Sequence, residues 1–260
     1  MKERGYIMTS GNNYAFRKAI EGTRSETIAT KKGIGIKSIV LLGIVFITSL
    51  LIISNLTSIV IRLGTYALIA YIVASLANFV LQMIIAFIPS TTKALSIPYA
   101  ISEGILIGSL VGLLELAIPG YGVKIGGLAL IITVCIFFAS SILYTTGIVK
   151  PNQKFKAVML TILFGTVLAT LILSIVSIFA YDFIYTMLYD SPIGIIIGAL
   201  MVIISGIYVV ISLDYANQVA EAGVDKKYEW YAAYGITINV VWLFLEVFRL
   251  LIIIYNRSNR

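Results

Sequence analysis

The segment Leu213–Tyr255 reads LDYANQVAEAGVDKKYEWYAAYGITINVVWLFLEVFRLLIIIY, and it decides how the rest of the chain is interpreted. Asp214 stands at the end of one long apolar run, a polar and aromatic turn follows, and the last apolar run carries Glu246 and Arg249. Inside a membrane, each such charge costs roughly 2.5–3.5 kcal/mol on insertion scales. We therefore expect each of these charges to have a partner or a function.

Composition places the chain in a membrane. Of its 260 residues, 60% are hydrophobic and 12% are charged, and the mean hydropathy is +1.01. Soluble domains hold roughly 45–50% apolar and about 25% charged residues. The net charge of +7 lies mostly in the tail and connectors rather than on one soluble face, which argues against a nucleic-acid partner. The expected environment is the lipid bilayer.

Seven apolar runs are long enough to cross a hydrocarbon core of about 30 Å, which needs about 20 helical residues. They predict an all-α integral membrane protein in which a flexible basic tail, residues 1–35, precedes one seven-helix domain, residues 36–260. The predicted spans lie near residues 36–56, 63–88, 97–117, 125–149, 157–181, 193–213 and 231–255.

Lysine and arginine are divided unequally between alternate connectors. The side that holds the N-terminal tail carries fourteen of the 19 Lys and Arg residues, the other side carries four, and Arg249 lies within a span. Membrane proteins retain positive charge on the cytoplasmic side. We therefore expect a multi-pass protein of the cell (inner or plasma) membrane with a cytoplasmic N-terminus and an outer C-terminus.

The absence of histidine narrows the chemistry of the chain, which also has a single cysteine, Cys135. These counts exclude an internal disulfide, histidine-based catalysis and the usual zinc, haem or copper sites. Carboxylates are then the main groups that can take up protons. Three further polar residues are candidates for lining a path: Asn78 and Gln82, which share a helix face, and Glu103, which is either interfacial or in a cytoplasmic cavity.

Glu246 has two interpretations. Arg249 is three residues further on, so the two side chains can neutralise each other within one helix. Alternatively, Glu246 faces Asp214 across the bundle, and the two carboxylates titrate as one coupled pair. That pairing requires a break near Gly235, because a helix unbroken from Tyr228 places Glu246 about 27 Å along it, whereas Asp214 lies about 12 Å from the end of its own helix.

The motifs LDY, NQV, KKYEWYAAYG and WLFLEVFRLL, with PYAISEGILIGSLVGLLE in the third span, resemble the Bax inhibitor family of seven-span membrane proteins in its longer bacterial form. The resemblance covers most of the chain after the tail. It implies a bundle with the seventh span at its centre, and a pH-sensitive calcium leak governed by an acidic pair, which Asp214 and Glu246 match here. Many shorter members have an arginine cluster that is absent from this chain, so Lys93 or Arg249 is expected as the counter-charge.

Three functions compete. The first is a passive, pH-gated calcium path, because oxygen ligands suit calcium and acidic residues attract cations. The second, which the resemblance also implies, is a protein that binds and restrains another membrane protein, such as a protease or a death regulator. The third is an intramembrane aspartyl protease, but the Gly-x-Gly-Asp motif of those enzymes is absent and Glu246 is not aspartate. We therefore expect no enzymatic activity, no metal site and no cofactor, with calcium only as a permeating or transiently bound ion.

Overall fold

The computed structural model describes residues 28–64 and 66–258, so the predicted tail up to residue 27 lies outside the described residues. Within the described residues, seven helices are long and apolar enough to cross a membrane, which confirms the predicted all-α, seven-span architecture. The spanning helices are α2 (Lys31–Leu63), α3 (Tyr66–Phe87), α4 (Thr92–Ala117), α5 (Gly122–Thr145), α6 (Gln153–Phe179), α8 (Pro192–Glu221) and α9 (Tyr228–Ser258). The shorter elements are a 3-10 helix η1 (Pro89–Thr91), α7 (Tyr181–Tyr185) and a π-helix η2 (Thr186–Asp190).

α2 begins five residues before the predicted first span. The Thr30 hydroxyl caps it by accepting a hydrogen bond from the backbone N–H of Gly33 at 2.9 Å. Just before the cap, Ala29 is buried, and its backbone N–H donates to the carbonyl oxygen of Val224 at 2.8 Å. Residues 28–35 are predicted to belong to the tail; in the structure Lys31–Gly35 are the first residues of α2, and Ala29 and Ile34 are buried.

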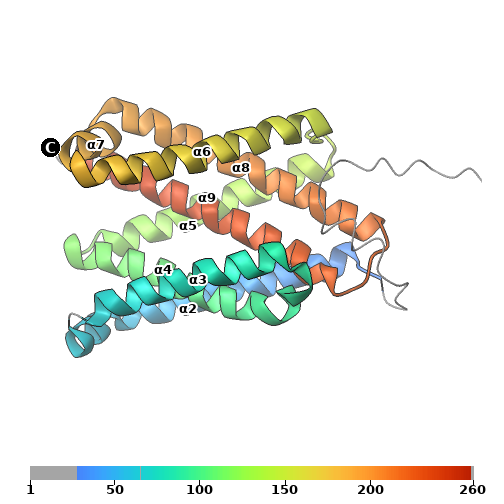
Figure 1. Cartoon of the computed structure of the whole chain (residues 1–260), viewed down its shortest axis with the longest axis horizontal. Helices are drawn as coiled ribbons and strands as arrows, with labels where there is room; N and C mark the ends of the chain where they lie inside the picture. Colours follow the sequence, from blue (N-terminus) through green and yellow to red (C-terminus); the bar gives the residue numbers. More distant parts are fainter. Residues whose placement is uncertain (1–27, 65, 259–260) are drawn as a thin grey trace, which may run out of the picture.

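α9 crosses the middle of the bundle (Figure 1). It contacts α2, α4, α5 and α8, and half of its most apolar 18-residue window is buried, more than in any other spanning helix described. Leu243, Val247 and Ile253 are among its buried side chains, and the rings of Phe244 and Phe248 stack at 5.8 Å. The predicted central position of the seventh span is confirmed.

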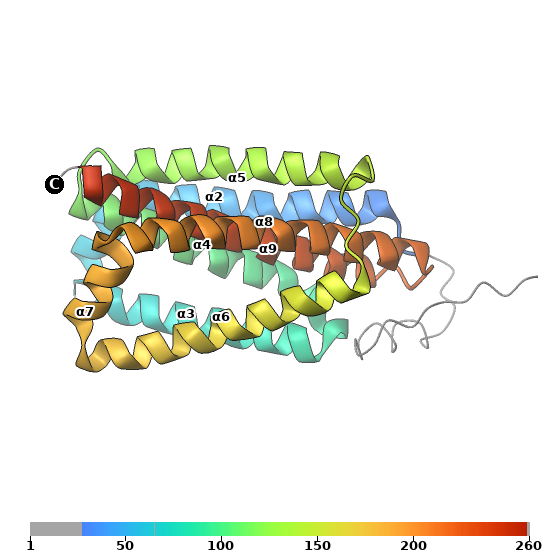
Figure 2. The same ribbon diagram turned by 90° about the horizontal axis from the view of Figure 1, so that it is seen from above.

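α3 and α6 lie at the periphery, on the side of the bundle away from α5 (Figure 2). α6 is the least buried spanning helix, because none of its most apolar 18 residues is buried. Two polar contacts tie its first half to α8. The Tyr208 hydroxyl donates to the carbonyl oxygen of Met159 at 2.5 Å, and Lys156 forms an ion pair with Asp214. Packing therefore restrains α6 less than the other spanning helices.

Glycines allow α4 to approach α2 closely. A Cβ atom at Gly104 would lie 2.6 Å from the carbonyl oxygen of Val45, and one at Gly108 would lie 2.6 Å from that of Ser49. Small residues spaced four apart are a common means of close helix contact in membranes. The spacing, a weak signal in a chain with 21 glycines, here marks a real interface.

We expect Gly108→Ala to destabilise the protein by about 1–3 kcal/mol, because the new methyl group would meet backbone atoms that cannot rotate away. The control is Gly165→Ala on α6, where nothing lies within 4 Å of the added atom. That variant should be neutral or slightly more stable, because alanine favours helix over glycine. Thermal unfolding in detergent, followed by circular dichroism, compares them. Equal midpoints would contradict the close approach.

The two ends of the bundle differ in charge. We define the basic end as the start of α2 together with the α3–α4, α5–α6 and α8–α9 connections. Its lysines are Lys31, Lys32, Lys37, Lys93, Lys150, Lys154, Lys156, Lys226 and Lys227. The described residues of the opposite end hold Arg62, Lys124 and Arg257. The asymmetry predicted from the connectors is thus present in three dimensions.

Candidate functional site

Asp214 joins three helices near the basic end. From α8, its Oδ2 forms an ion pair with Lys156 of α6, and its Oδ1 accepts a hydrogen bond from the Tyr144 hydroxyl of α5 at 3.1 Å. Gln218, one turn further along α8, donates to Oδ2 at 2.6 Å. The Asp214 side chain is 15% exposed, so the pair is largely removed from water. Under these conditions, loss of either partner leaves a poorly solvated charge.

The counter-charge of Asp214 is therefore Lys156, and the prediction of Lys93 or Arg249 is wrong for this carboxylate. Lys93 is exposed in the first turn of α4, and Arg249 lies beside Glu246. In the sequence, Lys156 is one of three lysines between the fourth and fifth apolar runs and has no feature that marks a partner. It reaches Asp214 because α6 begins beside the last turns of α8, although the two residues are 58 apart in sequence.

Glu246 is held within its own helix. The Trp242 indole N–H donates to Oε1 at 3.1 Å, and a guanidinium nitrogen of Arg249 lies 3.6 Å from Oε2. Oε2 accepts no hydrogen bond from the described part of the chain, so the ion pair is its main interaction. Of the two interpretations of Glu246, the structure shows the intrahelical pair with Arg249.

Asp214 and Glu246 do not form the predicted direct pair. α9 runs unbroken from Tyr228 to Ser258, with buried residues on both sides of Gly235, so the required break is absent. At 1.5 Å per residue, Glu246 lies about 27 Å from the start of α9, and Asp214 about 11 Å from the adjacent end of α8. The two carboxylates are therefore at different depths along their helices, and they belong to separate networks.

Glu103 and Asn78, predicted as path-lining residues, meet between α4 and α3. The Asn78 side-chain amide donates to Glu103 Oε2 at 2.5 Å, and the Ser102 hydroxyl donates to Asn78 Oδ1 at 3.0 Å. Both Asn78 and Glu103 are buried, so Glu103 is inside the bundle rather than at its surface. Gln82, one turn from Asn78, is half-buried and takes no part in this described network.

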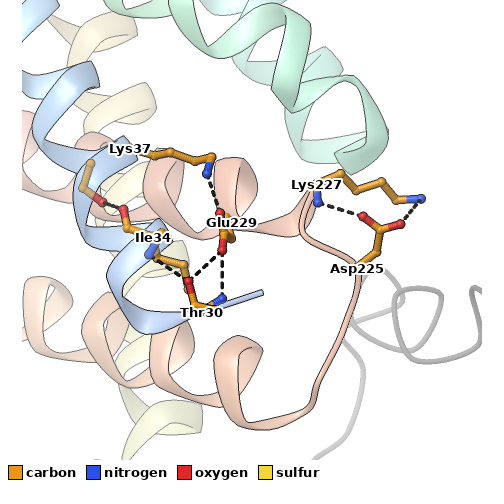
Figure 3. A network of polar contacts seen from close by, with 8 residues as sticks. Thr30, Ile34, Lys37, Asp225, Lys227 and Glu229 are labelled. Atoms are coloured by element: carbon orange, nitrogen blue, oxygen red, sulfur yellow. Dashed lines mark hydrogen bonds and ion pairs between the residues drawn. The ribbon is translucent and has the colours of Figure 1, made fainter. Parts of the chain in front are cut away.

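A further carboxylate, Glu229, is completely buried at the start of α9 (Figure 3). Its Oε2 forms an ion pair with Lys37 of α2, and its Oε1 accepts hydrogen bonds from the Thr30 backbone N–H at 2.8 Å and hydroxyl at 3.0 Å. A Cβ atom at Gly33 would lie 2.2 Å from Oε1, so only glycine leaves room for the carboxylate. Glu229 thereby fastens the start of α2 to the start of α9.

Protonation can act on each of these ion pairs separately. Among the described residues, Asp214, Glu246 and Glu229 each have one cationic partner, and proton uptake by a carboxylate removes its attraction for that partner. The Asp214 and Glu229 pairs link different helices, whereas the Glu246 pair does not. Within residues 28–64 and 66–258, no group of three or more Cys, Asp or Glu side chains could hold a metal ion.

Comparison with known proteins identifies the family. A family model described as Bax inhibitor 1 like matches residues 8–256. The chain belongs to this family. No curated protein and no solved structure matches it. The match includes every helix that carries the networks described above, and it agrees with a multi-pass membrane protein.

In this Bax inhibitor family member, sequence reasoning missed the Lys37–Glu229 pair. In the sequence, Glu229 closely follows the polar segment Asp225–Lys227 and is indistinguishable from an interfacial turn, and Lys37 is continuous with the basic tail. One signal was available. Lys37 is followed by a long apolar run, and a lysine at the edge of such a run needs either water or a partner.

Proposed function

We propose that this protein is a passive calcium leak whose opening follows pH through the Asp214–Lys156 ion pair. The observation that carries the proposal is the position of this pair, which ties α8 to the least buried spanning helix, α6. A pH-sensitive calcium leak is also what the family resemblance implies. The proposal includes no catalytic step and no resident cofactor, and calcium is the permeating ion.

The proposed gate is the start of α6. When Asp214 is ionised, it attracts Lys156 and holds this end of α6 against α8. Protonation of Asp214 removes the attraction and leaves a charged lysine that is better solvated away from the bundle. Because α6 has little packing of its own, its end can then move as a unit. We assign Glu103 and Glu246 to the path as oxygen groups that attract calcium.

The direction of sensing follows from the charge asymmetry. We place the basic end in the cytoplasm, because membrane proteins retain Lys and Arg on that side. Asp214 is about 11 Å from the end of α8 at this side. In this orientation, the proposed gate responds to cytoplasmic rather than external protons.

Calcium flux in liposomes tests the assignment. The wild-type protein, reconstituted with an enclosed calcium dye, is expected to pass more calcium as the pH falls. Asp214→Asn mimics the protonated acid, so its flux should already be raised at neutral pH and should depend little on pH. Lys156→Met removes the cationic partner of Asp214 and should also raise the calcium flux at neutral pH. Asp182→Asn, an exposed carboxylate on α7, is the control and should keep the wild-type profile.

Glu246→Gln tests the role of Glu246 independently of Asp214, the other member of the acidic pair that the family resemblance implies. Because Glu246 is bonded within α9, this variant is expected to change the amount of flux but to keep its pH dependence. Full pH dependence in Asp214→Asn would overturn the sensor assignment. Absence of calcium flux at every pH would overturn the leak itself and favour the second function, restraint of another membrane protein.

A further inference from the structure

Two cavities lie end to end along α2, α5 and α9. The inner cavity measures about 540 Å³ and the outer one, at the basic end, about 480 Å³. On α9, Ile236 lines the outer cavity and Val240 lines the inner one, and on α2 these positions are Gly35 and Ile39. Each pair is one helical turn apart, about 6 Å, so the two cavities adjoin near the basic end, and the inner one extends to Val123 in the first turn of α5. We call the two adjoining cavities the groove.

The inner part of the groove is apolar. Its two hydroxyl groups, on Ser49 and Thr133, donate to backbone carbonyl oxygens of their own helices and offer no free donor. Gly43 keeps it wide, because nothing lies within 4 Å of the position of a Cβ atom there. Its rim faces the bilayer, with 60% of Phe138 and 48% of Leu50 exposed. A hydrocarbon chain can enter this part sideways from the membrane.

The outer part of the groove carries positive charge. Lys31 and Lys150 line it, together with Tyr144 and Asn217. Lys31 lies 3.3 Å from Glu221 in a pair that is mostly exposed to water, and no acidic side chain in the described part of the chain pairs with Lys150. The neighbouring Asp214 is already neutralised by Lys156. The mouth therefore keeps an unbalanced positive charge.

We propose that this groove binds an anionic phospholipid from the leaflet at the basic end. The phosphate lies beside Lys31 and Lys150, and one acyl chain lies in the apolar part between α2 and α5. The two parts of the groove match the two parts of such a lipid. The cationic pocket lies at the basic end, where the headgroup would be, and the apolar part lies next to it on the side of the bilayer centre. An acyl chain that moves from the bilayer into the groove passes from one apolar environment to another and gains no hydrophobic free energy. Selection among lipids therefore comes from the headgroup charge.

Lipid retention tests the site. Purified protein is delipidated, mixed in detergent with equal amounts of phosphatidylglycerol and phosphatidylcholine, and analysed by native mass spectrometry. The wild type should retain phosphatidylglycerol roughly tenfold better. The double variant Lys31→Gln/Lys150→Gln should lose that preference. Lys32→Gln/Lys226→Gln removes the same charge from the same end outside the groove and should keep it.

A variant that adds volume without changing any charge tests the apolar part of the groove. Gly43→Leu fills the apolar part, and should fold because the added side chain has space and leucine is a stronger helix former than glycine. It should reduce phosphatidylglycerol retention about tenfold. Unchanged retention in this variant, equal retention of the two lipids by the wild type, or an equal loss in the Lys32/Lys226 control would each overturn the proposal. Complete displacement by glycerol phosphate would also overturn it, because the site would then take a soluble phosphate.

Discussion

Replacement of Lys37 by methionine is expected to destabilise the protein by about 3–5 kcal/mol, because Glu229 then keeps a buried negative charge without a counter-charge. The Glu229 side chain has no exposed surface and that of Lys37 is 17% exposed, so water does not replace the lost partner. The two hydrogen bonds from Thr30 remain, but they do not neutralise the carboxylate. The free energy of unfolding, obtained by denaturant titration in detergent micelles, measures the effect.

Lys31→Met is the matched control for this prediction. Lys31 stands on the same helix and pairs with Glu221, but both side chains are more than half exposed. Exposed pairs contribute about 0–1 kcal/mol. The double variant Lys37→Met/Glu229→Leu should regain most of the stability lost in Lys37→Met, since no buried charge is then left unpaired. A loss in Lys37→Met no larger than in Lys31→Met would show that the buried pair does not hold α2 on α9.

The seven spans could be predicted because a bilayer fixes the length of a helix and excludes most charges from its centre. The ends of the helices are less well determined by that argument. α2 was expected to begin near residue 36, but it begins at Lys31 because Thr30 caps it and Glu229 accepts hydrogen bonds from the same residue. Those interactions are made by polar groups, and a hydropathy pattern predicts that a polar segment belongs to the tail rather than to a span.

Side-chain partners could be predicted only where they are local. The pair of Glu246 and Arg249 follows from their separation of three residues on one helix. The partners of Asp214 and Glu229 are 58 and 192 residues away. These pairings depend on how each helix is rotated about its axis, and spans that are apolar on nearly all sides give little indication of that rotation. The assumption of a bend at Gly235 had no local signal, because a single glycine is tolerated inside a helix.

The Asn78–Glu103 contact gives the second large expected effect, because it satisfies a buried carboxylate between α3 and α4. Asn78→Leu removes the amide that donates to Glu103 and also the oxygen that accepts from Ser102. An unsatisfied buried polar group costs about 1–3 kcal/mol, and more when it is charged. We therefore expect Asn78→Leu to destabilise the protein by about 3 kcal/mol in the same denaturant titration.

Gln82→Leu is the control for Asn78→Leu, because Gln82 lies on the same face of α3, one turn away from Asn78. Gln82 is half-buried and outside the network, so its replacement should change the stability by about 0.5 kcal/mol or less. Asn78→Leu/Glu103→Leu removes both polar groups and should recover most of the loss, as expected when an apolar contact replaces a hydrogen-bonded pair. Equal effects of Asn78→Leu and Gln82→Leu would mean that Glu103 finds another donor once Asn78 is gone, so that the contact is not what joins α3 to α4.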